Sequence, residues 1–191
     1  MQKKIQELIQ SSINAKTELL NNEHLLLAMR RIVDVIVQTF QNGNHVYFCG
    51  NGGSAADAQH LAAEFSGRFY KNRKALPAEA LHCNTSYLTA VANDYSFDVI
   101  YSRMIDGLGK KGDVLIGLST SGNSKNIVQA LATAQAKGMV TIGFTGAAGG
   151  LLSSVSNFLI NAPSNDTPRI QEVHMLVGHI ICQLVEEKIF S

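Results

Sequence analysis

The stretch GNGGSAADAQHLAAEFSGR, from Gly50 to Arg68, follows directly on the apolar run His45–Cys49. An apolar run, a glycine-rich turn and a helical pattern in that order are typical of the first strand, loop and helix of a βαβ unit. Within the turn, Gly50, Gly52 and Ala55 match the spacing G-x-G-x-x-G/A of a dinucleotide-binding loop. The stretch therefore predicts an α/β fold and raises the question of which ligand its loop holds.

Strand-like and helical patterns continue to alternate after this stretch. Together with the run before Gly50, the strand-like runs are His45–Cys49, Ala78–Cys83, Val114–Leu118, Val140–Phe144 and Phe158–Asn161. Pro168 marks the first turn of the last helical pattern, with Asp166 or Thr167 as its expected cap. Right-handed crossovers between parallel strands place helices on both faces of a sheet. The pattern therefore predicts a three-layer, doubly wound α/β sandwich with a five-stranded parallel sheet in the flavodoxin-like order 2-1-3-4-5.

Two amphipathic segments, one from Ile5 to Leu20 and one from Leu25 to Phe40, precede the first strand. The chain has 191 residues, of which 46% are hydrophobic, and no repeat or low-complexity linker divides it. We expect a single domain over residues 1–191, in which residues 1–42 form a helical arm and residues 43–191 the α/β core.

The composition excludes several classes of partner. A net charge of +1 gives no broad basic surface for nucleic acid or an anionic membrane. No segment resembles a secretory signal or approaches the length of a transmembrane span, so we expect a soluble cytoplasmic protein. Three widely spaced cysteines, Cys49, Cys83 and Cys182, lie in apolar segments, which predicts buried, reduced thiols.

A nucleotide cofactor is disfavoured by the residues after the glycine loop. A dinucleotide site needs an acidic residue about 20 residues past the glycines, at the end of the second strand, to hold the ribose. That strand ends in His82, Cys83 and Asn84, and its acidic residue, Glu79, lies near its beginning. We therefore expect no nucleotide at this loop.

A second polar loop follows the run Val114–Leu118 and opens another helical pattern. It carries four hydroxyl groups within six residues: Ser119, Thr120, Ser121 and Ser124. Free N–H groups and a partial positive charge at a helix start bind phosphate, and hydroxyl groups add further donors. Helix capping is the alternative and would suffice for one serine. The number of hydroxyls favours a phosphate site, beside the glycine loop at the topological switch point.

Two helices carry side chains suited to chemistry. His60 and Glu64 lie one turn apart and share a helix face, which suits a zinc ion but also a solvated pair. Gln171 and His179 of the last helix are about 80° and about 12 Å apart, so only by leaning together could both reach one ion. A glutamate and a histidine beside a phosphate site suit proton transfer next to a sugar carbonyl, through an enediolate.

Four segments together resemble the bacterial phosphoheptose isomerases of the sugar isomerase (SIS) family. They are GNGGSAADAQHLAAEFSGRF, AVANDYSFDVIYSRM, LIGLSTSGNSKNI and TPRIQEVHMLVGHIICQLVE, and the likeness spans essentially the whole chain. The resemblance implies a homotetramer with active sites at subunit boundaries, to which the helical arm contributes. It also implies conversion of sedoheptulose 7-phosphate to D-glycero-D-manno-heptose 7-phosphate, the first step toward the ADP-heptose of lipopolysaccharide.

The resemblance also implies roles for individual positions. Glu64 is expected to be the base that moves a proton from C1 to C2, and His179 its acid partner. A zinc ion is expected at His60, Glu64, Gln171 and His179. Contacts to the sugar phosphate are expected from Gly52, Gly53, Ser54, Glu64, Asn93, Asp94, Ser119, Thr120, Ser121, Ser124 and Gln171, and a further contact to the sugar from Asp166.

Two rival readings belong to other classes. A relative of this family is a non-catalytic tetrameric regulator that binds the bacterial replication initiator, but it lacks the acid and histidine found here as Glu64 and His179. A sugar-phosphate sensor of a transcription regulator needs a DNA-binding domain, and the residues before His45 are too few and too neutral to supply one. The enzyme is the favoured reading.

Overall fold

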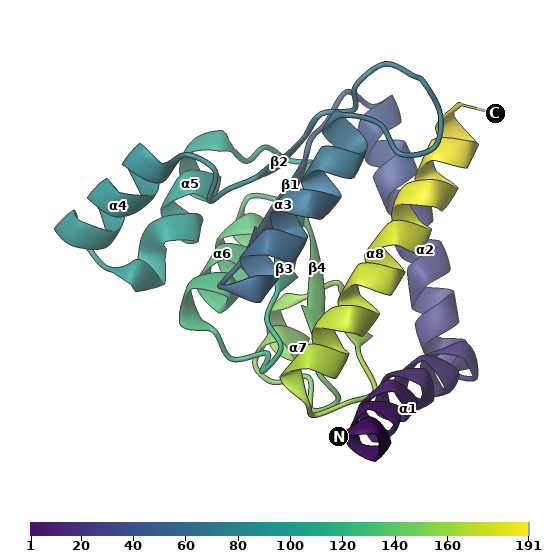
Figure 1. Cartoon of the computed structure of the whole chain (residues 1–191). Coiled ribbons are helices and arrows are strands. Elements are labelled where there is room, and N and C mark those ends of the chain that lie inside the picture. The colour runs from purple at the N-terminus through teal and green to yellow at the C-terminus, as the bar shows by residue number, and fades with distance from the viewer. Residues whose placement is uncertain (191) are drawn as a thin grey trace.

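The structure is a computed structural model that describes residues 1–190. Helices and strands alternate after two N-terminal helices, as the sequence pattern predicts (Figure 1). The helices are α1 (Gln2–Leu20), α2 (Glu23–Gln41), α3 (Gly53–Ser66), α4 (Thr85–Asp94), the 3-10 turn η1 (Phe97–Val99), α5 (Ile100–Leu108), α6 (Lys125–Ala136), α7 (Leu152–Val155) and α8 (Thr167–Ile189). The strands are β1 (Val46–Gly50), β2 (Ala78–Ala80), β3 (Val114–Leu118), β4 (Val140–Thr145) and β5 (Phe158–Asn161).

The five strands form one parallel sheet in the order β2-β1-β3-β4-β5, which confirms the predicted topology. In the register of the two central strands, Val46 lies opposite Val114 and Gly50 opposite Leu118. Both strands are buried along their whole length, as expected for a sheet covered on two faces. The topology places the loops after β1 and β3 next to each other at the switch point.

Helices cover both faces of the sheet (Figure 1). Along β3, Val114, Ile116 and Leu118 pack into a core with α2, α3 and α8. Leu115 points to the opposite face and packs with residues of α5 and α6. Alternate side chains of one strand thus pack into two cores, one on each face of the sheet, which is the physical basis of the three layers.

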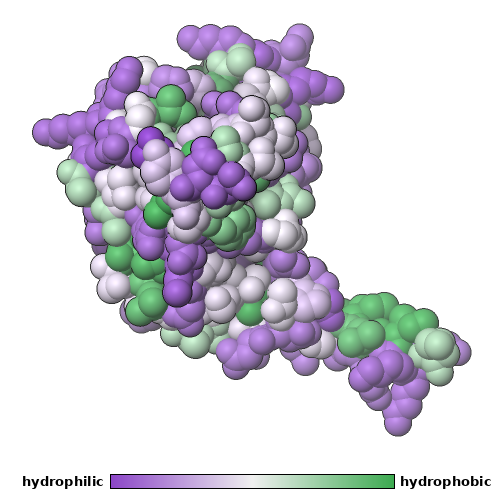
Figure 2. Space-filling model, turned by 90° about the vertical axis from the view of Figure 1, so that its left-hand side faces the viewer, coloured by the Kyte–Doolittle hydropathy of each residue, from purple (hydrophilic) through white to green (hydrophobic). Residues whose placement is uncertain are grey.

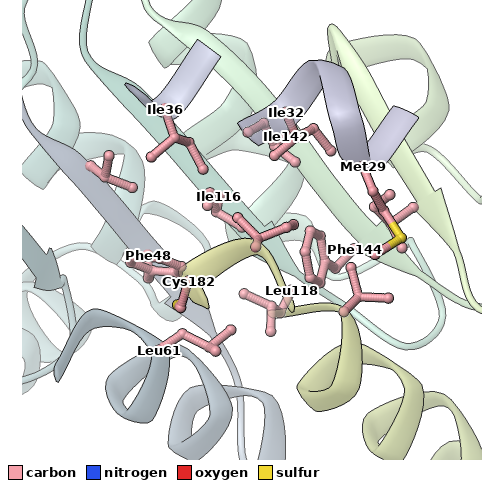
Figure 3. Packing of buried hydrophobic residues seen from close by; sticks show 14 of the residues in the cluster. Met29, Ile32, Ile36, Phe48, Leu61, Ile116, Leu118, Ile142, Phe144 and Cys182 are labelled. Atoms are coloured by element: carbon pink, nitrogen blue, oxygen red, sulfur yellow. The ribbon is translucent and has the colours of Figure 1, made fainter. Parts of the chain in front are cut away.

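The two helices α3 and α8 approach each other closely over the first core. Figure 3 shows Leu61 of α3 and Cys182 of α8 pointing into the same apolar cluster as Phe48 of β1. A Cβ atom on Gly178 of α8 would lie 2.5 Å from Cδ2 of Leu61. Glycine in the middle of α8 therefore permits this close helix packing, although it weakens the helix itself.

Helix α1 leaves an apolar stripe uncovered. Ile5, Leu8, Ile9 and Ile13 are each about half exposed, between 48% and 55%. In Figure 2 the projection at the lower edge of the molecule, which is the height of α1 in Figure 1, carries a green apolar patch. Exposed apolar patches of this kind are found where proteins contact other molecules.

Two local predictions were wrong in detail. The second strand ends at Ala80 rather than Cys83, because the chain turns there and Asn84 caps α4 by accepting a bond from the Tyr87 N–H. Cys83 lies in that turn and is exposed, whereas Cys49 and Cys182 are buried as predicted. Asp166 is the N-cap residue of α8, one of the two predicted, although within residues 1–190 its side chain makes no capping hydrogen bond. None of the described helices combines the length and apolarity needed to cross a membrane.

Candidate active site

The glycine loop between β1 and α3 depends on glycine at two positions. Gly52 precedes α3 with φ +55°, a conformation that other residues rarely adopt. A Cβ atom at Gly50 would lie 2.3 Å from the backbone oxygen of Ser54. These glycines let α3 start directly at the strand end, so its first N–H groups face the switch point of the sheet.

The hydroxyl-rich loop between β3 and α6 is internally organised. The Oγ atoms of Ser119 and Ser124 are 2.9 Å apart, and the Ser124 N–H donates to Ser119 Oγ over 3.4 Å. Ser121 Oγ accepts from the Asn123 N–H at 3.1 Å. In the part of the chain that the structure describes, Ser124 precedes α6 without a side-chain cap bond. The Ser124 hydroxyl is therefore not consumed by capping this helix, which is compatible with the phosphate interpretation, whereas the Ser119 and Ser121 hydroxyls each accept a backbone N–H of the loop.

Two contacts join these loops. The side-chain amides of Asn51 and Asn126 exchange hydrogen bonds, both 2.9 Å long, between the glycine loop and the first turn of α6. The Tyr101 hydroxyl donates to the Gly50 carbonyl at 2.6 Å and holds the strand end from the other side. The two helix starts are thereby fixed side by side, as a single anion-binding edge requires.

A second cluster lies farther along α3, where it meets α8. His60 Nε2 is 3.1 Å from Glu64 Oε1 and 2.9 Å from His179 Nε2. The His60 side chain is 49% exposed and that of Glu64 19%, so solvent and small molecules reach the cluster. One ligand atom from each of the three residues lies within 4.8 Å of the other two. Two imidazole nitrogens and a carboxylate oxygen form a donor set that fits zinc.

Comparisons with known proteins agree over nearly the full chain. Residues 10–146 match the model of the SIS domain family. A phosphoheptose isomerase of Aneurinibacillus thermoaerophilus is 50% identical over 95% of this chain and 92% of its own length. One from Clostridium acetobutylicum is 49% identical over 98% of this chain and 95% of its own. The chain belongs to the phosphoheptose isomerase family. It is accordingly an aldose–ketose isomerase.

Solved structures of this isomerase family share the fold. A phosphoheptose isomerase from Neisseria gonorrhoeae superposes with a TM-score of 0.91 at 39% identity, covering 97% of this chain and 98% of that one. One from Francisella tularensis gives a TM-score of 0.92 at 35% identity, covering 97% of both chains. A non-catalytic regulator is therefore not the favoured interpretation of this isomerase.

The isomerase's α8 presents its polar residues at two levels. His179 meets His60 and Glu64, whereas Gln171 lies against Gly53, where an added Cβ would come within 2.4 Å of the Gln171 amide nitrogen. Both line one cavity of about 630 Å³ together with Asp57, whose carboxyl pKa is raised by burial. One oxygen of Asp57 has no hydrogen-bond partner among the described residues. This cavity therefore runs along α8 from Gln171 to His179 of the histidine cluster.

Two predicted substrate contacts lie elsewhere in this chain. Asn93 and Asp94 end α4, are exposed, and bond to each other at 2.9 Å. Figure 1 shows α4 on the side of the molecule away from α8. Within one chain of this isomerase, therefore, these two residues are not brought to the cluster at His179.

Sequence reasoning missed the residues that hold the isomerase's site together. Asn126 pairs with Asn51, and a buried pair, Arg73 and Glu186, joins the end of α3 to α8. An acidic residue among the apolar residues of the last helix was the only available signal for Glu186. No spacing rule links it to an arginine 113 positions away.

Proposed function

We propose that the protein converts sedoheptulose 7-phosphate to D-glycero-D-manno-heptose 7-phosphate. The observation that carries this proposal is the cluster of Glu64, His60 and His179 on a chain that also has a hydroxyl-rich loop at a helix start. The names of relatives at about half identity over nearly the whole chain support the same sugar phosphate class of substrate. As the chain belongs to an enzyme family, scaffold function alone is a weaker account.

In the proposed mechanism the phosphate is held by donors at helix starts. Ser119, Thr120, Ser121 and Ser124 surround it, and the N–H groups at Gly52, Gly53 and Ser54 face the same edge. Asn93, Asp94 and Gln171 hold the sugar hydroxyls, with Asp166 nearby. Binding energy from the phosphate thereby positions C1 and C2 at the other end of the sugar.

Proton transfer then takes place between C1 and C2. Glu64 takes the proton from C1 while His179 donates a proton to the oxygen on C2, which gives an enediol. Glu64 returns its proton to C2, and His179 accepts the proton of the hydroxyl on C1, so that C1 becomes the aldehyde. A carboxylate and an imidazole with separate tasks suffice for both half-steps.

The donor set of His60, Glu64 and His179 would hold a zinc ion. Gln171, the fourth ligand that the family resemblance implies, lies beside Gly53 in this chain and would have to turn toward His179 to join them. A zinc ion held by these residues would supply Lewis-acid stabilisation of negative charge on the sugar oxygens. The role of this chain is to supply two imidazoles and a carboxylate already gathered on two packed helices.

We also propose that the protein forms a homotetramer with active sites at subunit boundaries. Glu64 follows Gly53 by eleven residues of one helix, a rise of about 16 Å. That distance exceeds the length of a seven-carbon sugar phosphate, and Asn93 and Asp94 lie away from α8. The position of Asn93 and Asp94 favours sites completed by a second copy. We assign the apolar stripe of α1 to the interface of this tetramer. The stripe belongs to the arm of residues 1–42, which together with the core of residues 43–191 forms one domain.

The proposal places the reaction in the cytoplasm, because a phosphate ester carries charge that prevents passage through a bilayer. We assign the reaction to the first step toward the ADP-heptose of lipopolysaccharide. Nucleic acid, membrane and nucleotide have no part in this proposed function.

Incubation with sedoheptulose 7-phosphate in deuterated water tests the proposal. NMR should detect the heptose 7-phosphate, with deuterium at C2 to the extent that the proton on Glu64 exchanges with solvent. The assay is run with and without added zinc. An absence of conversion under both conditions would refute the proposed reaction.

A further inference from the structure

The imidazole of His179 is in contact with an aromatic ring that has no part in the proposed chemistry. The rings of Phe69 and His179 are stacked, with centroids 5.7 Å apart and an angle of 27° between their planes. His60 contacts the same imidazole edge-on, at 5.1 Å and 71°. His179 therefore has one neighbour that belongs to the polar cluster and one that is purely apolar.

Phe69 lies in the irregular segment that follows α3, and a buried carboxylate holds its backbone. Glu186 of α8 is 2% exposed and accepts the Phe69 N–H at 3.2 Å. The same carboxylate accepts the N–H groups of Tyr70 at 2.8 Å and Lys71 at 2.9 Å. Three consecutive backbone donors on one carboxylate leave this segment little freedom. In Figure 1 the segment arches across the upper ends of α3 and α8.

Arg73 completes the arrangement from the side of α3. Its Nε donates to Glu186 at 2.9 Å, and its other nitrogens donate to the carbonyls of Glu64 and Phe65, both at 2.8 Å. These are carbonyls of the last helical turn, which lack partners within the helix. The Arg73 side chain is only 3% exposed. One buried ion pair thus fastens the end of α3, the segment with Phe69, and α8.

The geometry points to Phe69 as a positioning residue for His179. The Arg73–Glu186 pair holds its ring in place. This inference rests on the proposed function, in which His179 transfers protons to the sugar oxygens. The imidazole can rotate about two bonds, and the stacked ring disfavours the rotamers that carry it away from Glu64. Displacement of a catalytic group by about 1 Å can cost about a hundredfold in rate.

Substitutions at Phe69 test the inference through a split between kcat and KM. In Phe69→Leu we expect kcat to fall by about tenfold while KM changes by less than about twofold, because substrate contacts remain and only orientation is lost. Phe69→Tyr keeps the ring and should retain at least half of the wild-type kcat. Phe158→Leu, at an equally half-buried phenylalanine on an edge strand, is the matched control and should leave both constants unchanged. If Phe69→Leu does not fold, Phe69→Met replaces it.

The His179→Gln variant separates this inference from the proposed function. With His179 replaced, Phe69→Leu should cause no further loss of the residual rate, because the ring then has no imidazole to orient. A wild-type rate in His179→Gln would overturn the proposed role of His179. A large loss in His179→Gln together with a wild-type kcat in Phe69→Leu would overturn only the positioning role. The positioning role would also be overturned if the losses of kcat from His179→Gln and Phe69→Leu multiplied in the double variant. Equal losses of kcat in Phe69→Leu and Phe69→Tyr would overturn it as well.

Discussion

Individual side chains of the site differ in how firmly their surroundings define them. Glu64 touches His60 through one oxygen and is largely covered, whereas His60 is half exposed. A glutamate placed between solvent and a packed helix interface keeps access to substrate while its position stays defined. The carboxylate of Glu64 is the group on which the proposed reaction depends most.

Replacement of Glu64 by glutamine should abolish turnover and leave binding of the sugar phosphate intact. Glutamine has nearly the same shape but cannot accept a proton from carbon at neutral pH. We expect kcat to fall by at least about a hundredfold, the range typical of general base catalysis. Calorimetric titration with the sugar phosphate measures the retained affinity. A variant with the wild-type rate would exclude Glu64 as the base.

His174 should make stability depend on pH. Its side chain is fully buried, its Nε2 lies 3.1 Å from the Thr145 carbonyl, and burial lowers its pKa to about 4. The unfolded chain, with a histidine pKa of about 6.5, binds this proton first as the pH falls. The folded state therefore loses stability between about pH 6.5 and about pH 4, by up to about 3 kcal/mol over that window.

The measurement is urea unfolding of the wild type and of His174→Leu across this range. The free energy of unfolding of the wild type should fall more steeply with decreasing pH than that of the variant. Comparing the two slopes removes the contribution of the carboxylates, which both proteins share. Equal slopes would mean that His174 is protonated without cost in the folded state.

At the scale of elements, the site is a product of how α3 and α8 pack against each other. Gly178 leaves room for the Leu61 side chain, and the next residue, His179, contacts His60. Two turns farther along α8, Glu186 accepts hydrogen bonds from the segment after α3. Burial raises the pKa of the Glu186 carboxyl, but the three N–H groups and Arg73 outweigh that effect and the net pKa is lowered. The stability that Glu186 contributes is therefore present at neutral pH and is lost as the pH falls through that lowered pKa.

Truncation of Glu186 should strongly destabilise the fold. Glu186→Ala leaves a buried guanidinium and three backbone N–H groups without their acceptor, and breaking such a pair costs about 3–5 kcal/mol. Glu187→Ala is the matched control, because this neighbour is exposed and, among residues 1–190, its side chain bonds only to Gln183. Its effect should stay within about 0.5 kcal/mol. Denaturant unfolding compares the two variants, and similar losses in both would contradict the role of the pair.

At the scale of the whole molecule, the apolar stripe on α1 is the feature that one chain does not explain. Four half-exposed aliphatic residues at helical spacing lie on an arm that projects from the body (Figure 2). In the proposed tetramer, contact with a further copy of the chain would cover them. The proposed active site is then a property of the assembly.

Charge on this stripe should dissociate the assembly and remove activity together. The double substitution Ile5→Lys, Ile9→Lys places two ammonium groups where apolar contact is expected. Gln6→Lys, Gln10→Lys adds the same charge on other exposed positions of the helix and should change neither property. Light scattering after size exclusion measures mass, and the isomerase assay measures rate. A tetrameric, active Ile5/Ile9 variant would contradict the assigned interface.

The sequence by itself determined the layers, the strand order and the two polar loops, because these follow from local periodicity, glycine positions and the handedness of crossovers. It also identified His60 and Glu64, which are neighbours on one helix face. Only the tertiary structure decided that His179 joins them while Gln171 sits beside Gly53, and that Arg73, Glu186 and Phe69 support the cluster. Contacts between residues more than a hundred positions apart depend on how two helices pack, and no local pattern records that packing.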